Sequence, residues 1–275
     1  MKTINDLSPS QTEQDKRFSP VSQVRWRLFG IGVVTVWLLV WELSIQYVLG
    51  QLYFVPPSVM LRSFYRSLLV TGELGDHIWA TVIRLVSGLV VGAVPAVWLG
   101  LHMGRNERAR VRYGLFLAAL GLIPVIASFP FFIVMFGVRD LQKWAMVAAA
   151  VFYPILYCTT KGVQISRTLQ VAGKSPVEGV IRSDWLHGPG PWIFTGLKLG
   201  SVIGVATLLG AEMYASTRGL GFEIIVAMQK LNLVYGYVGM LAAALVMYVL
   251  WLSLTAIESA VGRSVSVRDR LAKFI

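Results

Sequence analysis

Residues 85–103 read LVSGLVVGAVPAVWLGLHM and contain no lysine, arginine, aspartate or glutamate. A helix needs about 20 apolar residues to cross the hydrocarbon core of a bilayer, so this run predicts a membrane-spanning helix. The rest of the chain has the same character, since 56% of its residues are hydrophobic and 14% are charged, whereas a soluble domain has about 25% charged residues. The sequence therefore predicts an all-α integral membrane protein.

Six runs of the sequence are long and apolar enough to be spans. Charged residues are rare in them: the first contains Glu42, and the fifth holds Lys198 near one end and Glu212 near the other. Spans of a β-barrel would instead be segments of about ten residues that alternate in polarity, and these runs do not alternate. The expected spans are residues 28–48, 85–103, 113–138, 144–160, 191–214 and 235–257.

Basic residues predict the orientation of the spans, because lysine and arginine collect in short loops on the cytosolic side. With six spans, the N-terminal tail, the loop after the second span, the loop after the fourth span and the C-terminus lie on one side, and these segments hold most of the basic residues. We therefore expect both termini in the cytosol. The net charge of +11 then reflects topology and contact with anionic membrane lipid, and no nucleic-acid-binding motif accompanies it.

The chain divides into two tails and one membrane domain. Residues 1–26 are polar, so we expect a disordered cytosolic tail and not a cleavable signal. Residues 27–265 form the expected transmembrane domain with a polar cytosolic loop at 161–190, and residues 266–275 form a basic cytosolic tail. The sequence has no phosphate-binding loop and no metal-ligand spacing of His, Cys, Asp and Glu. No catalytic, cofactor or metal site is therefore expected in this chain.

Polar and helix-breaking residues inside the spans require a physical reason. An ionisable group at membrane depth is costly and usually faces a cavity or a partner. Glu212 is therefore predicted either to line the outer part of a translocation pathway or to hydrogen-bond structurally near the outer interface. Pro124 and Pro130 interrupt the third span, so residues 123–132 either wall a pathway, where freed carbonyls are tolerated, or form a kink that improves packing.

Small residues follow one face of the second span. Gly88, Gly92, Ala96 and Gly100 recur at every fourth position, and small residues at this spacing let two helices approach closely. We expect close helix packing at this face rather than a pathway. Arg84, at the mouth of the same span, either lines a pathway or, as the favoured interpretation, extends its charge to the membrane interface.

Several short motifs occur in one order along the chain. Together they resemble the permease subunits of ATP-binding-cassette (ABC) importers, specifically the branch that handles sulfonates, taurine, nitrate or bicarbonate, and thiamine-precursor compounds. The resemblance covers roughly residues 28–265. The motifs are Pro56-Pro57-Ser58, Ala80-Thr-Val-Ile-Arg84, Ile123-Pro124, PWIFTGLKL at 191–199, Ala211-Glu-Met and STRGLG at 216–221.

The resemblance implies a type I importer permease fold in a bacterial cytoplasmic (inner) membrane. It also implies partners: a second permease subunit, identical or different, two cytosolic ATPase subunits that use ATP and Mg, and an extracytoplasmic solute-binding protein. The chain itself would bind no cofactor and catalyse no reaction. Residue types and the resemblance together place the expected pathway at Pro124, Ser128, Pro130, Thr207, Glu212 and Met213.

In this family the ATPase docks on a short coupling helix in the loop before the fifth span, here residues 161–190. The family pattern of Glu-Ala-Ala, Gly and Leu-Pro is largely missing, and Leu186 alone matches directly. Ser175 and Glu178 have the spacing of a capping box, which predicts a shortened coupling helix at about residues 175–185. An irregular loop without a docking role is the alternative. The predicted coupling residues are Thr168, Gly173, Lys174, Ser175, Glu178, Arg182 and Leu186.

The altered coupling pattern leaves three possibilities within the family: one half of a heterodimeric permease, a partner for an altered ATPase, or a subunit that has lost tight coupling. Two alternatives come from other classes. An autonomous secondary transporter or channel often shows inverted repeats, and no convincing repeat relates the first three predicted spans to the last three. The second alternative from another class is a structural membrane subunit.

Overall fold

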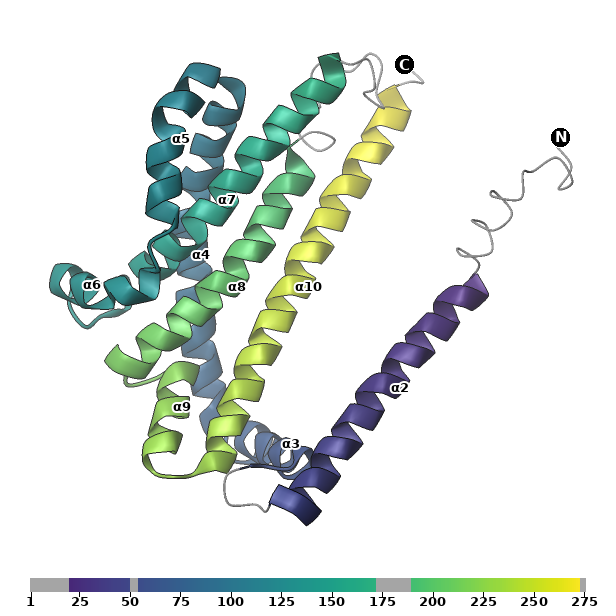
Figure 1. Cartoon of the computed structure of the whole chain (residues 1–275), viewed down its shortest axis with the longest axis vertical. Helices are drawn as coiled ribbons and strands as arrows, with labels where there is room; N and C mark the ends of the chain where they lie inside the picture. The colour runs from purple at the N-terminus through teal and green to yellow at the C-terminus, as the bar shows by residue number, and fades with distance from the viewer. Residues whose placement is uncertain (1–19, 50–53, 172–188, 273–275) are drawn as a thin grey trace, which may run out of the picture. The chain divides into compact units, whose positions relative to one another are not determined.

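The computed structural model describes residues 20–49, 54–171 and 189–272, and every regular element in them is a helix (Figure 1). The chain forms two compact units, Met1–Arg62 and Ser63–Ile275. The prediction of an all-α membrane protein is confirmed, because five helices are long and apolar enough to span a membrane and one bent helix pair adds a sixth candidate.

The first unit contains the predicted first span, which is apolar enough to cross a membrane over Phe29–Tyr47. Its helix begins at Pro20, inside the segment predicted as a tail. Glu42 accepts hydrogen bonds from the Ser58 N–H (3.0 Å) and hydroxyl (2.6 Å), and so satisfies a backbone donor that the first turn of a helix leaves free. The elements are α2 (Pro20–Ser44), the π-helical turn η2 (Ile45–Leu49) and the start of α3 (Pro57–Tyr65).

The second unit contains the remaining spans. Long helices alternate here with short ones, and the last long helix reaches Ala272, within the predicted C-terminal tail. Its elements are η3 (Arg66–Val70), α4 (Glu73–Arg105), α5 (Glu107–Gly121), η4 (Val125–Ser128), α6 (Phe129–Phe136), α7 (Asp140–Val171), α8 (Gly190–Ala215), α9 (Leu220–Gln229) and α10 (Leu233–Ala272).

Two spans differ from their predicted form. The third is not one helix, because α5 and the segment Val125–Phe136 meet at a bend of 76°. Pro124 lies at this bend with an extended backbone (ψ 106°), and proline cannot donate the N–H that would continue α5. The fourth span is longer than predicted, since α7 begins at Asp140 and continues as helix through the polar residues 161–171.

The small-residue face of α4 packs against α7, which confirms the packing role predicted for it. A Cβ at Gly88 would lie 2.5 Å from the Val147 Cβ, and a Cβ at Gly92 would lie 2.6 Å from the carbonyl oxygen of Ala148. Ala96, between these contacts and Gly100, is fully buried. The helix backbones therefore approach as closely as glycine allows.

On its other side α7 packs against α8, again through glycines. A Cβ at Gly196 would lie 3.0 Å from the Ile155 Cα, and one at Gly204 would lie 2.9 Å from Val151 Cγ1. Helices α4, α7 and α8 thus form the core of the second unit. Its central side chains are Leu85, Val147, Val151, Ile155 and Leu208.

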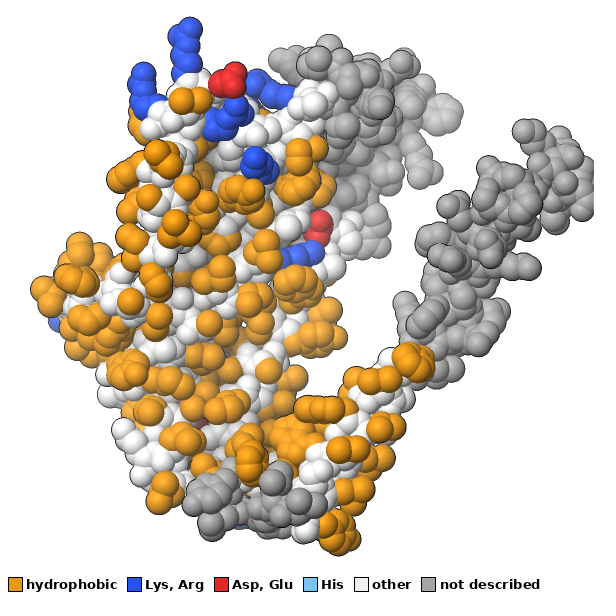
Figure 2. Space-filling model, in the orientation of Figure 1, with side chains coloured by type: hydrophobic (Ala, Val, Ile, Leu, Met, Phe, Trp, Pro, Cys, Tyr) orange, Lys and Arg blue, Asp and Glu red, His pale blue; other side chains and the backbone are white. Residues whose placement is uncertain are grey.

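One end of the second unit carries the α4–α5 connection, the end of α7 and the start of α8 (Figure 1). Arg167, on α7, donates a hydrogen bond to the carbonyl oxygen of Arg105 at the end of α4 (2.6 Å). Lysine and arginine side chains gather at this end (Figure 2). Its assignment to the cytosol stays a prediction. We call it the basic end, defined by Arg105, Arg108, Arg110, Arg112, Lys161 and Arg167.

Candidate functional site

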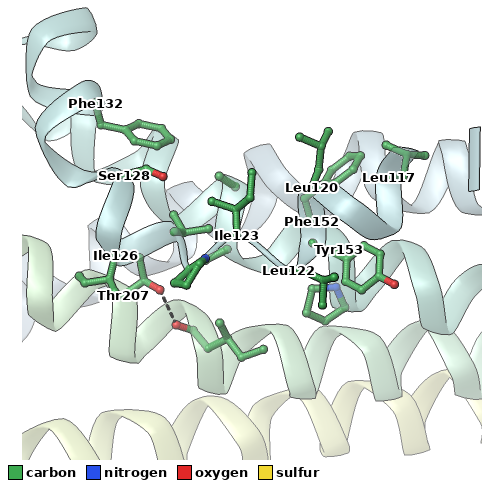
Figure 3. A pocket seen from close by; sticks show the side chains of 17 residues that line it. Leu117, Leu120, Leu122, Ile123, Ile126, Ser128, Phe132, Phe152, Tyr153 and Thr207 are labelled. Atoms are coloured by element: carbon green, nitrogen blue, oxygen red, sulfur yellow. Dashed lines mark hydrogen bonds between the residues drawn. The ribbon is translucent and has the colours of Figure 1, made fainter. Parts of the chain in front are cut away.

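A cavity of about 620 Å³ lies where the broken third span meets α7 and α8 (Figure 3). Residues 117–132 form one side of it, residues 149–154 of α7 another, and Ile203 and Thr207 of α8 complete the wall. Irregular backbone is tolerated at membrane depth where it lines a cavity or is buried in protein. The unwound segment at the 76° bend therefore lies where irregular backbone is tolerated.

The lining of this cavity is mostly apolar and uncharged. Its polar side chains are Ser128, Tyr153 and Thr207, and no charged side chain is among the described residues that line it. The Thr207 hydroxyl donates to the Ile203 carbonyl oxygen (2.9 Å, the dashed line in Figure 3). Within the described part of the chain the Ser128 hydroxyl has no hydrogen-bond partner. The cavity can therefore offer hydroxyl groups to a polar solute without holding it by a fixed charge.

The structure brings together three of the six residues predicted for the pathway. Pro124, Ser128 and Thr207 line the cavity. Pro130 lies in the first turn of α6, where the missing N–H leaves no hydrogen bond unmade. Met213 lies on α8 outside the lining. The pathway role of these residues stays a prediction.

Glu212 lies apart from the cavity, in a buried ionic cluster toward the other end of the second unit. Its side chain is 0% exposed, and its carboxylate accepts hydrogen bonds from Arg84 Nη1 (2.9 Å), the Thr81 hydroxyl (2.9 Å) and the Gly221 N–H (3.0 Å). Arg84 also donates from Nε to Asp140 (2.7 Å). Of the two interpretations of Glu212, its contacts match structural hydrogen bonding.

The side chain of Arg84 is buried among acidic partners and does not extend away from the protein. Its side chain is only 11% exposed, because the carboxylates of Glu212 and Asp140 hold it between α4, α8 and α7. A buried charge is retained where it is paired and hydrogen-bonded. Sequence reasoning treated each charged residue alone and so missed the pair.

The ionic cluster also fixes the turn between α8 and α9. The Leu220 N–H donates to the Thr81 hydroxyl (2.8 Å), and Gly219 has a φ of +129° that favours glycine. A Cβ at Gly219 would collide with the carboxylate of Glu212, and one at Gly221 with the carbonyl oxygen of Leu209. The Arg84 segment therefore meets, in one cluster, the Glu212 and STRGLG segments, which lie more than 120 residues later in the chain.

Comparison with known proteins follows the same motifs. No protein-family model matches the chain. The chain is 26% identical to the taurine transport system permease protein of Escherichia coli strain K12 over 252 residues. These aligned residues are 85% of this chain and 90% of that protein. Further relatives are named as ABC transporter permeases. The chain is a relative of the ABC transporter permeases.

Two other transport permeases are also similar to this chain. The formylaminopyrimidine transport permease protein of Halalkalibacterium halodurans is 27% identical over 191 residues, which are 67% of this chain and 75% of that protein. The nitrate import permease protein of Synechocystis sp. is 24% identical over 209 residues, 70% of this chain and 73% of that protein. The branch predicted from the sequence is confirmed, and with it a multi-pass location in the inner membrane.

The structure describes only part of the predicted coupling loop of this chain. Residues 161–171 belong to α7, and Thr168 is exposed there, with its hydroxyl donating to the Gln164 carbonyl oxygen (3.1 Å). The predicted coupling helix at 175–185 lies outside the described residues. So do Gly173, Lys174, Ser175, Glu178, Arg182 and Leu186.

Proposed function

We propose that this chain is the transmembrane subunit of an ATP-driven importer and that the cavity at the broken third span belongs to its pathway. The observation that carries the proposal is the cavity itself, because Pro124, Ser128 and Thr207 line it beside an unwound segment. Its volume of about 620 Å³ lies within the range of about 300–1,000 Å³ typical of small-molecule sites.

The proposed solute is a small polar or anionic compound. The relatives are named for taurine, formylaminopyrimidine and nitrate, and each name denotes a compact polar solute. An uncharged lining with a few hydroxyl groups suits transient passage of such a solute, since a fixed countercharge would hold an anion more tightly. Selection would then rest mainly with an extracytoplasmic binding protein.

We place the proposed ATPase subunits at the basic end. The connection between α4 and α5 and the end of α7 lie together there, and the predicted coupling segment follows α7. Cytosolic loops carry an excess of lysine and arginine, which supports a cytosolic position for this end and for both termini. A second permease subunit, identical or different, would complete the pathway.

Transport by purified components tests this proposal. The chain is co-purified with candidate ATPase and permease subunits, reconstituted in vesicles, and assayed for solute uptake with a binding protein. Ala149→Leu adds bulk to the cavity wall and is expected to lower ATP-dependent uptake several-fold. The control Ala244→Leu makes the same change at an exposed position on α10 and should leave uptake unchanged.

Two results would contradict the proposal. One is the absence of a stable complex with any ATPase subunit under any condition. The other is uptake that requires an ion gradient and no ATP, which would instead make the chain a secondary transporter.

A further inference from the structure

A second cavity, of about 380 Å³, lies between α4, α5 and α7. It contains two basic residues of the basic end, and it adjoins the first cavity, since Leu117 and Tyr153 line both. None of the predicted pathway residues lines it, whereas Lys161 and Gln164 belong to the predicted coupling loop at 161–190. The lining residues are Met103, Arg110, Gly114, Leu117, Ala118, Tyr153, Leu156, Tyr157, Thr160, Lys161 and Gln164.

Two cationic side chains line this cavity from different helices. Arg110, on α5, donates one hydrogen bond from Nη2 to Glu107 (2.8 Å). The Glu107 side chain is 79% exposed, so this ion pair is weak and most of the guanidinium donors stay available. Lys161, on α7, has its amine 5.8 Å from the centre of the Tyr157 ring, and within the described residues no carboxylate lies at ion-pair distance from it.

The remaining polar groups of the lining add neutral donors to these charges. The Gln164 amide and the hydroxyls of Tyr153 and Tyr157 have no hydrogen-bond partner among the described residues, whereas the Thr160 hydroxyl already donates to the Leu156 carbonyl oxygen (2.8 Å). The cavity therefore combines two positive charges with uncommitted polar groups. Such convergence of a few polar groups on an otherwise apolar wall is typical of ligand sites.

Small residues of α5 keep the cavity open. Gly114 and Ala118 are four residues apart, so they lie on the same face of the helix, and both line the hollow. A Cβ built on Gly114 meets no atom within 4 Å. This contrasts with Gly121 of the same helix, where a Cβ would collide with the Tyr153 ring. Gly114 thus borders open space, and a Cβ there would meet no protein atom.

We propose that this cavity binds the oxyanion of a phosphate or sulfonate group between Arg110 and Lys161. A guanidinium matches such groups with paired donors, while an ammonium adds a point charge. The apolar side chains Met103, Leu117 and Leu156 would contact the hydrocarbon part that carries the anion. The ligand is either an anionic lipid headgroup or a small free anion. This site goes beyond the proposed function, because binding there does not require transport.

Binding measurements on the purified full chain test the site. Native mass spectrometry measures retained phosphatidylglycerol, and calorimetry measures free methanesulfonate and inorganic phosphate. We expect wild-type protein to bind one of these probes. The double variant Arg110→Gln/Lys161→Gln and the filling variant Gly114→Leu should each weaken binding at least tenfold. Arg108→Gln removes an exposed charge of the same helix that does not line the cavity, and should leave binding within twofold of wild type.

The outcomes separate the sources of the anion. Retention of phosphatidylglycerol that is lost in both cavity variants supports a lipid site, and binding of a free anion that is lost in both supports a solute site. Failure of wild-type protein to bind any of the three probes would overturn the proposal. So would an equal loss in Arg108→Gln, which would indicate general surface charge. Either failure leaves the importer proposal intact, since that is tested by uptake.

Discussion

Replacement of Arg84 with methionine would leave the carboxylate of Glu212 buried without its guanidinium partner. The carboxylate is 0% exposed and loses the 2.9 Å charge-assisted hydrogen bond from Arg84, while the Thr81 and Gly221 donors remain. Removal of one member of a buried ion pair lowers the free energy of unfolding by about 3–5 kcal/mol. We expect Arg84→Met to show a loss in this range.

Two further variants show how much of this loss in the free energy of unfolding comes from each acidic partner of Arg84. Asp140 is the more exposed partner of Arg84, at 56%, so Asp140→Asn should cost no more than about 1 kcal/mol. Arg84→Met/Glu212→Gln removes the uncompensated charge and keeps an oxygen acceptor for the Thr81 hydroxyl and the Gly221 N–H. This double variant should recover about 2 kcal/mol of the loss, since the penalty of a buried unpaired charge is then absent.

The assay is reversible unfolding in mixed detergent micelles, followed by tryptophan fluorescence. Every variant is compared with wild type at equal detergent composition. If Arg84→Met lost less than about 1 kcal/mol, or if the double variant were no more stable than the single one, the ion pair would not hold this end of the second unit together.

Three further predictions use the same unfolding assay. Gly92→Ala should lower stability by about 1–3 kcal/mol, because its Cβ would lie 2.6 Å from a carbonyl oxygen of α7. Gly114→Ala, whose Cβ meets no atom within 4 Å, should instead raise stability by about 0.5–1 kcal/mol, since alanine has the higher helix propensity; equal effects would contradict the packing argument. Gly219→Ala should lower stability by about 2 kcal/mol or more, since it combines a φ of +129° with a collision against a buried carboxylate; wild-type stability would show that this turn is not constrained. Lys198→Met should cost about 1–3 kcal/mol, because it removes a 2.6 Å hydrogen bond from α8 to a half-buried carboxylate of α10, and unchanged hydrogen exchange in α10 would argue against that link.

Local sequence properties were sufficient to predict most of the spans. Long apolar runs predicted α4, α8 and α10 because a bilayer fixes helix length, and the four-residue spacing from Gly88 to Gly100 predicted a close helix contact because that spacing repeats on one helix face. Pro124 and Pro130 predicted an interruption of the third span. They did not predict the bend of 76°, because its size depends on how the two segments pack against α7.

The ionic cluster could not be predicted from local properties. Arg84, Asp140 and Glu212 are separated by 56 and more residues in the chain, and each alone resembles an interfacial charge. A usable signal was present, however, in the motifs that carry the family resemblance. The segment 80–84 contains Arg84, the segment 211–213 contains Glu212, and the segment 216–221 contains glycines that a buried contact requires. A buried charge needs a partner of opposite sign. Pairing the charges across the motifs would have suggested the cluster.

The packing of the second unit also indicates which helices can move. Helices α4, α7 and α8 meet through glycines whose Cβ positions are already occupied by neighbouring atoms, and the Arg84 cluster ties all three together. Packed cores of this kind deform little. By contrast α5 and α6 make far fewer contacts with α7 than α4 and α8 do, and they meet at the bend beside the first cavity. We therefore expect a change in the volume of that cavity to come from movement of α5 and α6 against α7, while the three-helix core stays fixed.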